Sequence, residues 1–179
     1  MEYIRLSTPR WGLREIHADD VSRLIEYLND PDIYANTLLI PYPYSQADAL
    51  KFITINRELE SNHDLHVNWM ITDPEDRVIG GIGLLYEYGI TSHKSGFGYW
   101  IGEPFRGQGL MSEVVNAFSA MIFQHTPLIR LEAHVFLHNP ASARVLVKAG
   151  YSKEGLMRQA YYKDGIYLDA WMYARLKRI

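Results

Sequence analysis

Two glycines beyond the middle of the chain suggest a site that binds an anion. Gly107 and Gly109 follow a run of strand-forming residues, 97–102, and precede a segment, 110–122, whose apolar residues repeat at helical spacing. Glycine lacks Cβ, so the backbone can turn tightly and lie close to a ligand. The helix that follows directs unpaired N–H groups and the positive end of its dipole at the same point. The pattern predicts a phosphate-binding turn, although a strand-to-helix turn that merely needs glycines would look the same.

A second helix start lies about thirty residues further along the chain. Asn139 suits an N-cap position, Pro140 suits the first helical turn, and Gly150 suits the end of that helix. The side chains of Asn139 and Ser142 could face the same ligand. Either could instead serve only in capping the helix, and the residues alone leave these two interpretations open.

The two segments together resemble the GNAT acyl-CoA N-acetyltransferases, and within them the RimJ/RimL-like branch. The run 106–111 matches the family's Arg/Gln-x-x-Gly-x-Gly/Ala pyrophosphate loop at Arg106 and Gly109 and departs from it at Met111. Asn139 and Ser142, with a Gly-Tyr pair at 150–151, match the family's second motif. A tail at 163–169 resembles the C-terminal hairpin of the branch. The resemblance extends over nearly the whole chain.

The resemblance implies a fold and a cofactor. The fold is α+β, with a mixed, mostly antiparallel central sheet splayed between its fourth and fifth strands and helices on both faces, formed by a single domain over residues 1–179. Acetyl-CoA is the implied co-substrate, and no metal is implied. The residues expected to contact acetyl-CoA are Trp100, Ile101, Arg106, Gly107, Gln108, Gly109, Leu110, Met111, Ser112, Asn139 and Ser142.

Three residues are candidates for catalysis. Many GNAT enzymes place a tyrosine seven residues after the helix-starting asparagine to protonate the leaving thiolate, but Leu146 stands there, so the resemblance assigns this role to Ser142 or a water. Glu132 and Glu154 are candidate general bases. Either could instead be an ordinary surface carboxylate.

The expected activity is transfer of an acetyl group to a primary amine by direct attack on the thioester, with a protein N-terminal α-amine as the acceptor. The alternatives are a small-molecule amine (an antibiotic, polyamine or metabolite) and a non-catalytic acyl-CoA-binding module. Residues 39–44 and 163–168 should form the acceptor pocket. The five tyrosines Tyr42, Tyr44, Tyr161, Tyr162 and Tyr167 could form an aromatic wall, or fill the core and a dimer contact.

The composition limits the classes of partner that this protein is expected to bind. The 179 residues carry a formal charge of −3 and a pI of about 6.1, which argues against a nucleic-acid surface. There is no cysteine, no signal-peptide pattern, no apolar run of ~18 residues and no metal-ligand spacing among the seven histidines. A cytoplasmic protein that binds neither membrane nor metal is expected, and a homodimer is left open.

Periodicity and turn residues predict the remaining elements. A proline at position 31 should end the first helix, and Ser45 with Asp48 should cap the second. The expected strands are 11–16, 65–72, 78–86, 96–102, 131–136, 151–156 and 168–174, and the expected helices are 19–28, one following Ser45, 110–122 and 139–148, with a loop at 88–95.

Overall fold

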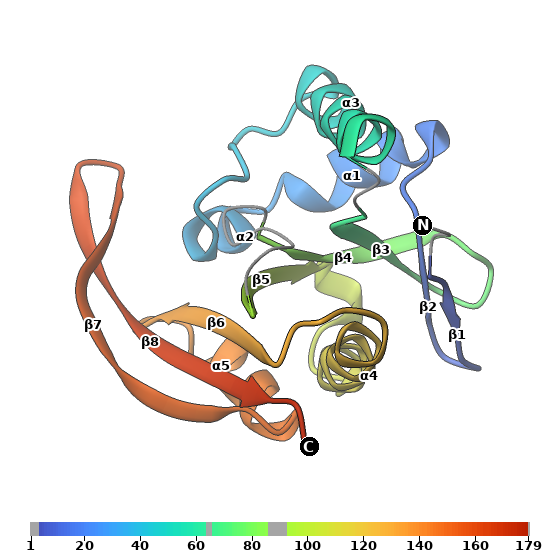
Figure 1. Ribbon diagram of the computed structural model, residues 1–179. Helices are drawn as coiled ribbons and strands as arrows, with labels where there is room; N and C mark the ends of the chain where they lie inside the picture. The colour runs from blue at the N-terminus through green and yellow to red at the C-terminus, as the bar shows by residue number, and fades with distance from the viewer. Residues whose placement is uncertain (1–3, 64–65, 86–92, 179) are drawn as a thin grey trace. The chain divides into compact units, whose positions relative to one another are not determined.

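The computed structural model describes residues 4–63, 66–85 and 93–178 (Figure 1). The chain forms two compact units. Unit 1 consists of Met1–Gly83 and Tyr99–Arg106, and unit 2 consists of Leu84–Gly98 and Gly107–Ile179. Leu65, the expected start of one strand, and residues 86–92, which include the end of the strand expected at 78–86 and part of the expected loop, lie outside the described residues.

Unit 1 is an antiparallel sheet with helices beside it. Its strands are β1 (Leu6–Ser7), β2 (Gly12–Arg14), β3 (Asn68–Thr72) and β4 (Val78–Leu84), each paired with the next. The last residues of β5 (Lys94–Ile101) belong to this unit, where the N–H of Gly102 donates to the carbonyl of Ile79 at 2.9 Å. β1 was not expected from the sequence.

The described helices of unit 1 are η1 (Ala18–Asp20), α1 (Val21–Leu28), α2 (Pro31–Asn36), α3 (Gln46–His63) and η3 (Glu103–Phe105). Figure 1 shows α1 and α3 lying together. Their apolar residues, among them Leu24, Leu28 and Ile53, form one buried cluster with Met70 of β3 and Val78 of β4. The expected cap of α3 is confirmed, because the N–H of Asp48 donates to Ser45 Oγ and the N–H of Ser45 donates to Asp48 Oδ2.

The helix α2 was missed by the sequence analysis, which took Pro31 only as the end of the preceding helix. Pro31 is also the first residue of α2, where its missing N–H costs nothing. Asp30 is the N-cap, and its side chain accepts from the N–H of Asp32 at 2.7 Å. One Asp-Pro pair therefore ends one helix and starts the next.

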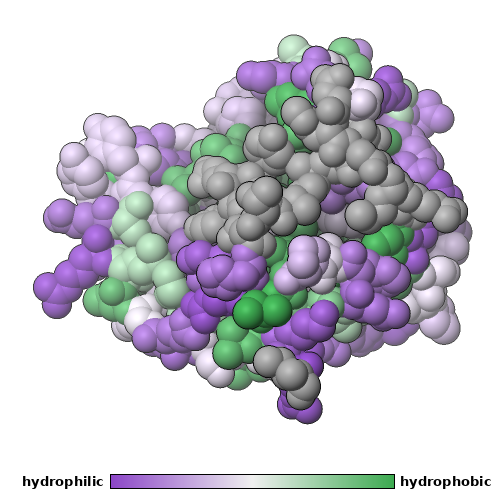
Figure 2. Space-filling model, viewed as in Figure 1, coloured by the Kyte–Doolittle hydropathy of each residue, from purple (hydrophilic) through white to green (hydrophobic). Residues whose placement is uncertain are grey.

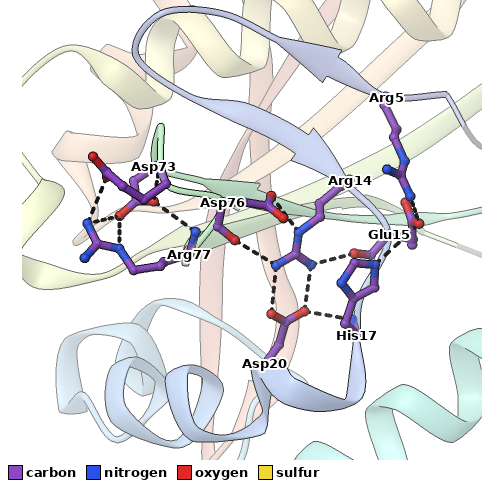
Figure 3. A network of polar contacts seen from close by, with 9 residues as sticks. Arg5, Arg14, Glu15, His17, Asp20, Asp73, Asp76 and Arg77 are labelled. Carbon is purple, nitrogen blue, oxygen red and sulfur yellow. Dashed lines mark hydrogen bonds and ion pairs between the residues drawn. The ribbon is translucent and has the colours of Figure 1, made fainter.

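A buried ion pair connects three segments of unit 1. Figure 3 shows the guanidinium of Arg14 between Asp20 and Asp76. Arg14 donates to both carboxylate oxygens of Asp20, at 2.8 and 2.9 Å, and its Nε donates to Asp76 Oδ1 at 2.9 Å. Burial alone would lower the pKa of Arg14, but the two carboxylates outweigh it and raise that pKa, so the pair stays charged. The interaction ties β2 to η1 and to the β3–β4 turn.

Unit 2 contains the remaining sheet. β5 pairs in parallel with β6 (Arg130–Phe136) over Lys94–Gly96, β6 pairs antiparallel with β8 (Ile166–Leu176), and β8 pairs antiparallel with β7 (Ser152–Lys163). All described pairings are antiparallel except β5–β6, which confirms the mixed, mostly antiparallel α+β class. Because β1 adds a strand, β5 and β6 are the strands expected as fourth and fifth.

The strands β7 and β8 form a long curved hairpin (Figure 1). They are longer than the expected strands at 151–156 and 168–174. The turn that joins them has Asp164 at φ 50° and Gly165 at φ 82°. Two successive residues with positive φ are the signature of a type I′ hairpin turn, which Asp-Gly favours.

The helices of unit 2 are α4 (Leu110–His125) and α5 (Pro140–Lys148). Phe97 of β5 packs against Phe118 of α4 and against Tyr151, with ring centroids 6.1 and 5.4 Å apart. Leu131 of β6 and Leu146 of α5 are fully buried. The predicted apolar faces of these elements therefore do form a core.

Where Figure 2 colours the residues by hydropathy, hydrophilic residues predominate on the face shown. No helix within the described residues is long and apolar enough to cross a membrane.

Candidate active site

The loop that enters α4 has the geometry of an anion cradle. Gly107 and Gly109 both have φ of +76°, in the left-handed region that favours glycine. A Cβ placed on either residue would meet no described atom within 4 Å. Glycine is therefore required by the backbone conformation, and one side of the loop is open. Gly109 is the N-cap of α4, and its carbonyl accepts from the N–H of Ser112 at 3.1 Å.

The first turn of α4 leaves backbone donors for a ligand. An α-helix provides no internal acceptor for its first N–H groups, here those of residues 109–111. These donors and the dipole of a 16-residue helix favour a phosphate at this point. The residues of the loop thus fit the pyrophosphate of acetyl-CoA.

Arg106, at the start of this loop, is held by acidic residues of unit 1. Its guanidinium forms an ion pair with Asp30, lies 3.7 Å from Asp32, and donates from Nε to the carbonyl of Ile101 at 3.2 Å. A side chain held by carboxylates is poorly placed to bind a phosphate as well. The contact of Arg106 with acetyl-CoA therefore stays a prediction, and the backbone of Arg106 is better placed to make it than the guanidinium.

The side chains that follow the two glycines differ in burial. Leu110 and Met111 are buried, at 5% and 6% exposed, and extend the apolar face of α4. The thioether of Met111, where the family pattern has a small residue, is thus accommodated by the core. Gln108 is exposed and Ser112 is half-buried.

Trp100 and Ile101 lie at the end of β5, in unit 1. A Cβ at Gly80 would come within 2.7 Å of the Trp100 carbonyl oxygen, and a Cβ at Gly81 within 2.5 Å of Trp100 Nε1. The glycines of β4 therefore make room for Trp100. Contacts of Trp100 and Ile101 with acetyl-CoA stay predictions.

Asn139 caps α5, as the sequence predicts. Its Oδ1 accepts from the N–H of Ser142 at 3.0 Å, and Pro140 occupies the first turn. Asn139 and Ser142 are both half-buried. The capping role is thus present, and a further role of either side chain toward acetyl-CoA stays a prediction.

The two candidate bases are held in one network of ion pairs. Glu132 is buried on β6 and accepts from Arg130 Nε at 2.6 Å and from Lys94 Nζ at 3.2 Å. Burial alone would raise the pKa of Glu132, but these hydrogen bonds and charges lower it below its usual value. Glu154 is exposed, and the pair with Arg130, at 3.0 and 2.5 Å, lowers its pKa too.

A carboxylate with a lowered pKa is a weak base at neutral pH. Glu132 and Glu154 therefore resemble structural partners of Arg130 more than proton acceptors. Their catalytic roles stay predictions that this geometry does not favour.

A histidine that the sequence analysis did not select lies on the same strand face as Glu132. His134 Nδ1 is hydrogen-bonded to the hydroxyl of Tyr161 on β7, and the two ring centroids are 5.9 Å apart. Its spacing of two residues from Glu132 was the one available signal, because alternate residues of a strand share a face.

The tyrosines proposed for an acceptor wall have different surroundings. Tyr44 is buried in the core of unit 1, at 6% exposed, while Tyr42 is about half exposed. In unit 2, Tyr162 and Tyr167 form an exposed pair near the tip of the hairpin, with ring centroids 5.0 Å apart. Of these four, only Tyr44 fills the core.

A family model described as an acetyltransferase (GNAT) domain matches residues 10–152. The probable N-acetyltransferase YjcK of Bacillus subtilis (strain 168) is 32% identical over 127 residues, which are 70% of this chain and 70% of that protein. The [ribosomal protein uS5]-alanine N-acetyltransferase of Escherichia coli (strain K12) is 26% identical over 93% of this chain and 87% of its own. The L-amino acid N-acetyltransferase AaaT of the same organism is 23% identical over 93% of this chain and 91% of its own.

Solved structures are similar over nearly the whole chain. RimL, a ribosomal L7/L12 α-N-protein acetyltransferase in complex with coenzyme A, matches with a TM-score of 0.80 and 25% identity over 98% of each chain. A spermidine N-acetyltransferase from Vibrio cholerae matches with a TM-score of 0.77 and 20% identity, over 94% of this chain and 96% of its own. At that identity, the second match shows the fold alone.

Proposed function

Because the chain belongs to the GNAT family of acetyltransferases, we propose that this N-acetyltransferase acts on the α-amine at the N-terminus of a protein. Acetyl-CoA is the acetyl donor. The observation that supports an acetyl-CoA-dependent transferase most directly is the open loop at Gly107 and Gly109, which offers backbone donors at the start of α4. We also propose a cytoplasmic location, which the lack of cysteine favours. A homodimer stays a prediction.

The residues of the chain have three tasks in this reaction. The loop before α4 binds the phosphates of acetyl-CoA, so that its thioester is held in one place. Backbone N–H groups near Trp100 and Ile101 stabilise the oxyanion that forms when the amine nitrogen attacks the thioester carbon. Ser142, at the start of α5, provides the hydroxyl that protonates the leaving thiolate.

The ion pairs of Glu132 and Glu154 favour an α-amine over a lysine side chain. The α-amine has a pKa of about 7.7 to 8, whereas that of lysine is about 10.4. An α-amine is already partly neutral near pH 7, so it needs only a weak base. Both candidate carboxylates have lowered pKa values, and a strong carboxylate base for lysine is not evident among them.

A small α-amine, such as a free amino acid, is the second candidate acceptor. The similarity to an L-amino acid N-acetyltransferase over 93% of the chain supports it. Its ionisation would match that of a peptide terminus, so the two acceptors differ in size and not in the chemistry required.

A panel of acceptors at saturating acetyl-CoA tests the proposal, with release of free CoA as the measurement. Peptides with a free N-terminus and no lysine should be acetylated, and the rate should rise with pH through about 7 to 8 as the α-amine loses its proton. The matched controls are the same peptides with a blocked N-terminus and one lysine, which should be inert. Efficient acetylation of the blocked peptides, or of amino acids or spermidine with all peptides ignored, would overturn the choice of acceptor.

A further inference from the structure

His134 combines a fixed orientation with an unused ring nitrogen. Its Nδ1 is hydrogen-bonded to Tyr161, while its Nε2 is buried and has no partner anywhere in residues 4–63, 66–85 or 93–178. A buried polar atom without a partner costs free energy, and such atoms are rare in folded proteins. Such an exception calls for an explanation, and a catalytic role is one explanation.

An irregularity in β7 accompanies the contact between Tyr161 and His134. Met157 pairs with Ala170 and Tyr161 pairs with Leu168, so residues 158–160 stand opposite Asp169 alone. Gln159 has φ of 48°, and its N–H donates to Asp169 Oδ1 at 2.7 Å. Such bulges redirect side chains and are frequent beside active sites. Beyond this one, the Tyr161 hydroxyl reaches across β8 to the ring of His134.

The surroundings keep the ring of His134 neutral. Burial lowers the pKa of His134, Glu132 on the same strand face raises it, and Lys94 on β5 lowers it, with a lower pKa as the net result. Arg130 is paired with both Glu132 and Glu154, and Phe136 packs its ring edge-on to Tyr161 at 5.6 Å. At neutral pH, one ring nitrogen therefore has a lone pair available to accept a proton.

We propose that His134 is the general base of acetyl transfer, with Nε2 as the proton acceptor and Tyr161 as the positioning residue. The Nδ1–H of His134 donates to the oxygen of Tyr161, which leaves the lone pair on Nε2. The missing partner of Nε2 is then the acceptor amine, or one water held by it. The inference rests on the proposed function only in requiring an amine acceptor, whichever amine that is.

The neutral amine nitrogen of the acceptor attacks the thioester carbon, so that the C–N bond forms and the C–S bond breaks. One proton of that nitrogen passes to Nε2 of His134, and the departing thiolate gains a proton from Ser142. Exchange with solvent removes the proton from His134 and restores the Ser142 hydroxyl, so the products are the amide and the CoA thiol.

The test compares His134→Gln and Tyr161→Phe with His138→Gln, an exposed histidine on the same segment that serves as a matched control. His134→Gln should lower kcat/KM for the amine by ~10²-fold and flatten the acidic limb of the pH profile. The Kd for CoA, from calorimetry, should not change. Tyr161→Phe should cause a smaller loss and move that limb to lower pH, because the imidazolium loses an acceptor. His138→Gln should behave as the parent.

All rates are measured with the best acceptor from the panel, so an error in the choice of acceptor does not affect this test. Absence of transfer to every amine by the parent protein would instead contradict the proposed function. His134→Gln with the parent's rate and pH profile would overturn the role of His134. A loss of CoA binding in proportion to the loss of rate would do so too, since it would show a structural role.

Discussion

Substitution of Gly109 by alanine separates the two reasons for a glycine at the start of α4. At φ +76° a residue with a Cβ costs about 1–2 kcal/mol of backbone strain. Gly165, in the turn between β7 and β8, has φ of 82° and, like Gly109, would place a Cβ with no described atom within 4 Å. Gly165→Ala is therefore a control with matched strain on a turn outside the cradle.

Both variants should lose the same stability, so their Tm values should fall by a similar amount, about 2–4 °C for each kcal/mol in a chain of this size. Only Gly109→Ala should weaken the binding of CoA, because its Cβ would enter the open side of the loop. Loss of one charge-assisted hydrogen bond to a phosphate, worth about 1.5–3 kcal/mol, raises Kd by roughly 10- to 100-fold.

Thermal unfolding and calorimetry with CoA measure the two effects separately. An equal Kd for Gly109→Ala and Gly165→Ala would show that the loop at Gly109 does not contact the phosphates. Equal losses of stability together with an equal Kd would further show that backbone strain alone accounts for the glycine.

Four further outcomes are expected. Asp20→Ala should lower the free energy of unfolding by about 3 kcal/mol, because it removes the buried partner of Arg14, and urea unfolding would show a much smaller loss if the pair were unimportant. Arg106→Gln should change the Kd for CoA by less than about tenfold, the smallest effect expected from losing one charge-assisted hydrogen bond, and a larger change would mean that its guanidinium binds the phosphates. Ser142→Ala should lower kcat by ~10²-fold with little change in the Kd for acetyl-CoA, and the reverse pattern would assign Ser142 to binding. The folded pKa of Glu132 lies below the unfolded value, so its contribution to stability is present above about pH 4.5 and is lost as pH falls through the folded pKa. In an acid titration, the free energy of unfolding of Glu132→Gln should lack this part of the decline.

Features with a local cause could be predicted from the sequence. The cap of α5 by Asn139, the glycine turn before α4 and the Asp-Gly turn at 164–165 each depend on residues within a few positions of each other. The helix α2 has a local signal as well, since Asp30 and Pro31 form an N-cap and a first turn. It was missed because the same proline also ends α1.

Features that depend on strand register could not be predicted in this way. The partners of Glu132 come from β5 and from its own strand, so its lowered pKa follows from a pairing that the sequence does not state. The contact between His134 and Tyr161 requires three adjacent strands and an irregularity that places three residues of β7 opposite one of β8. Neither residue is unusual in its own strand.

The path of the chain limits how this protein can be divided by engineering. Residues 1–83 and 99–106 belong to one unit and the segment between them belongs to the other, so neither unit is a continuous stretch of sequence. A fragment that ends at residue 83 would lack Trp100, which packs against the core of unit 1. Expression of either half alone should therefore give an incomplete core, and a split protein should recover its fold only when the two fragments are produced together.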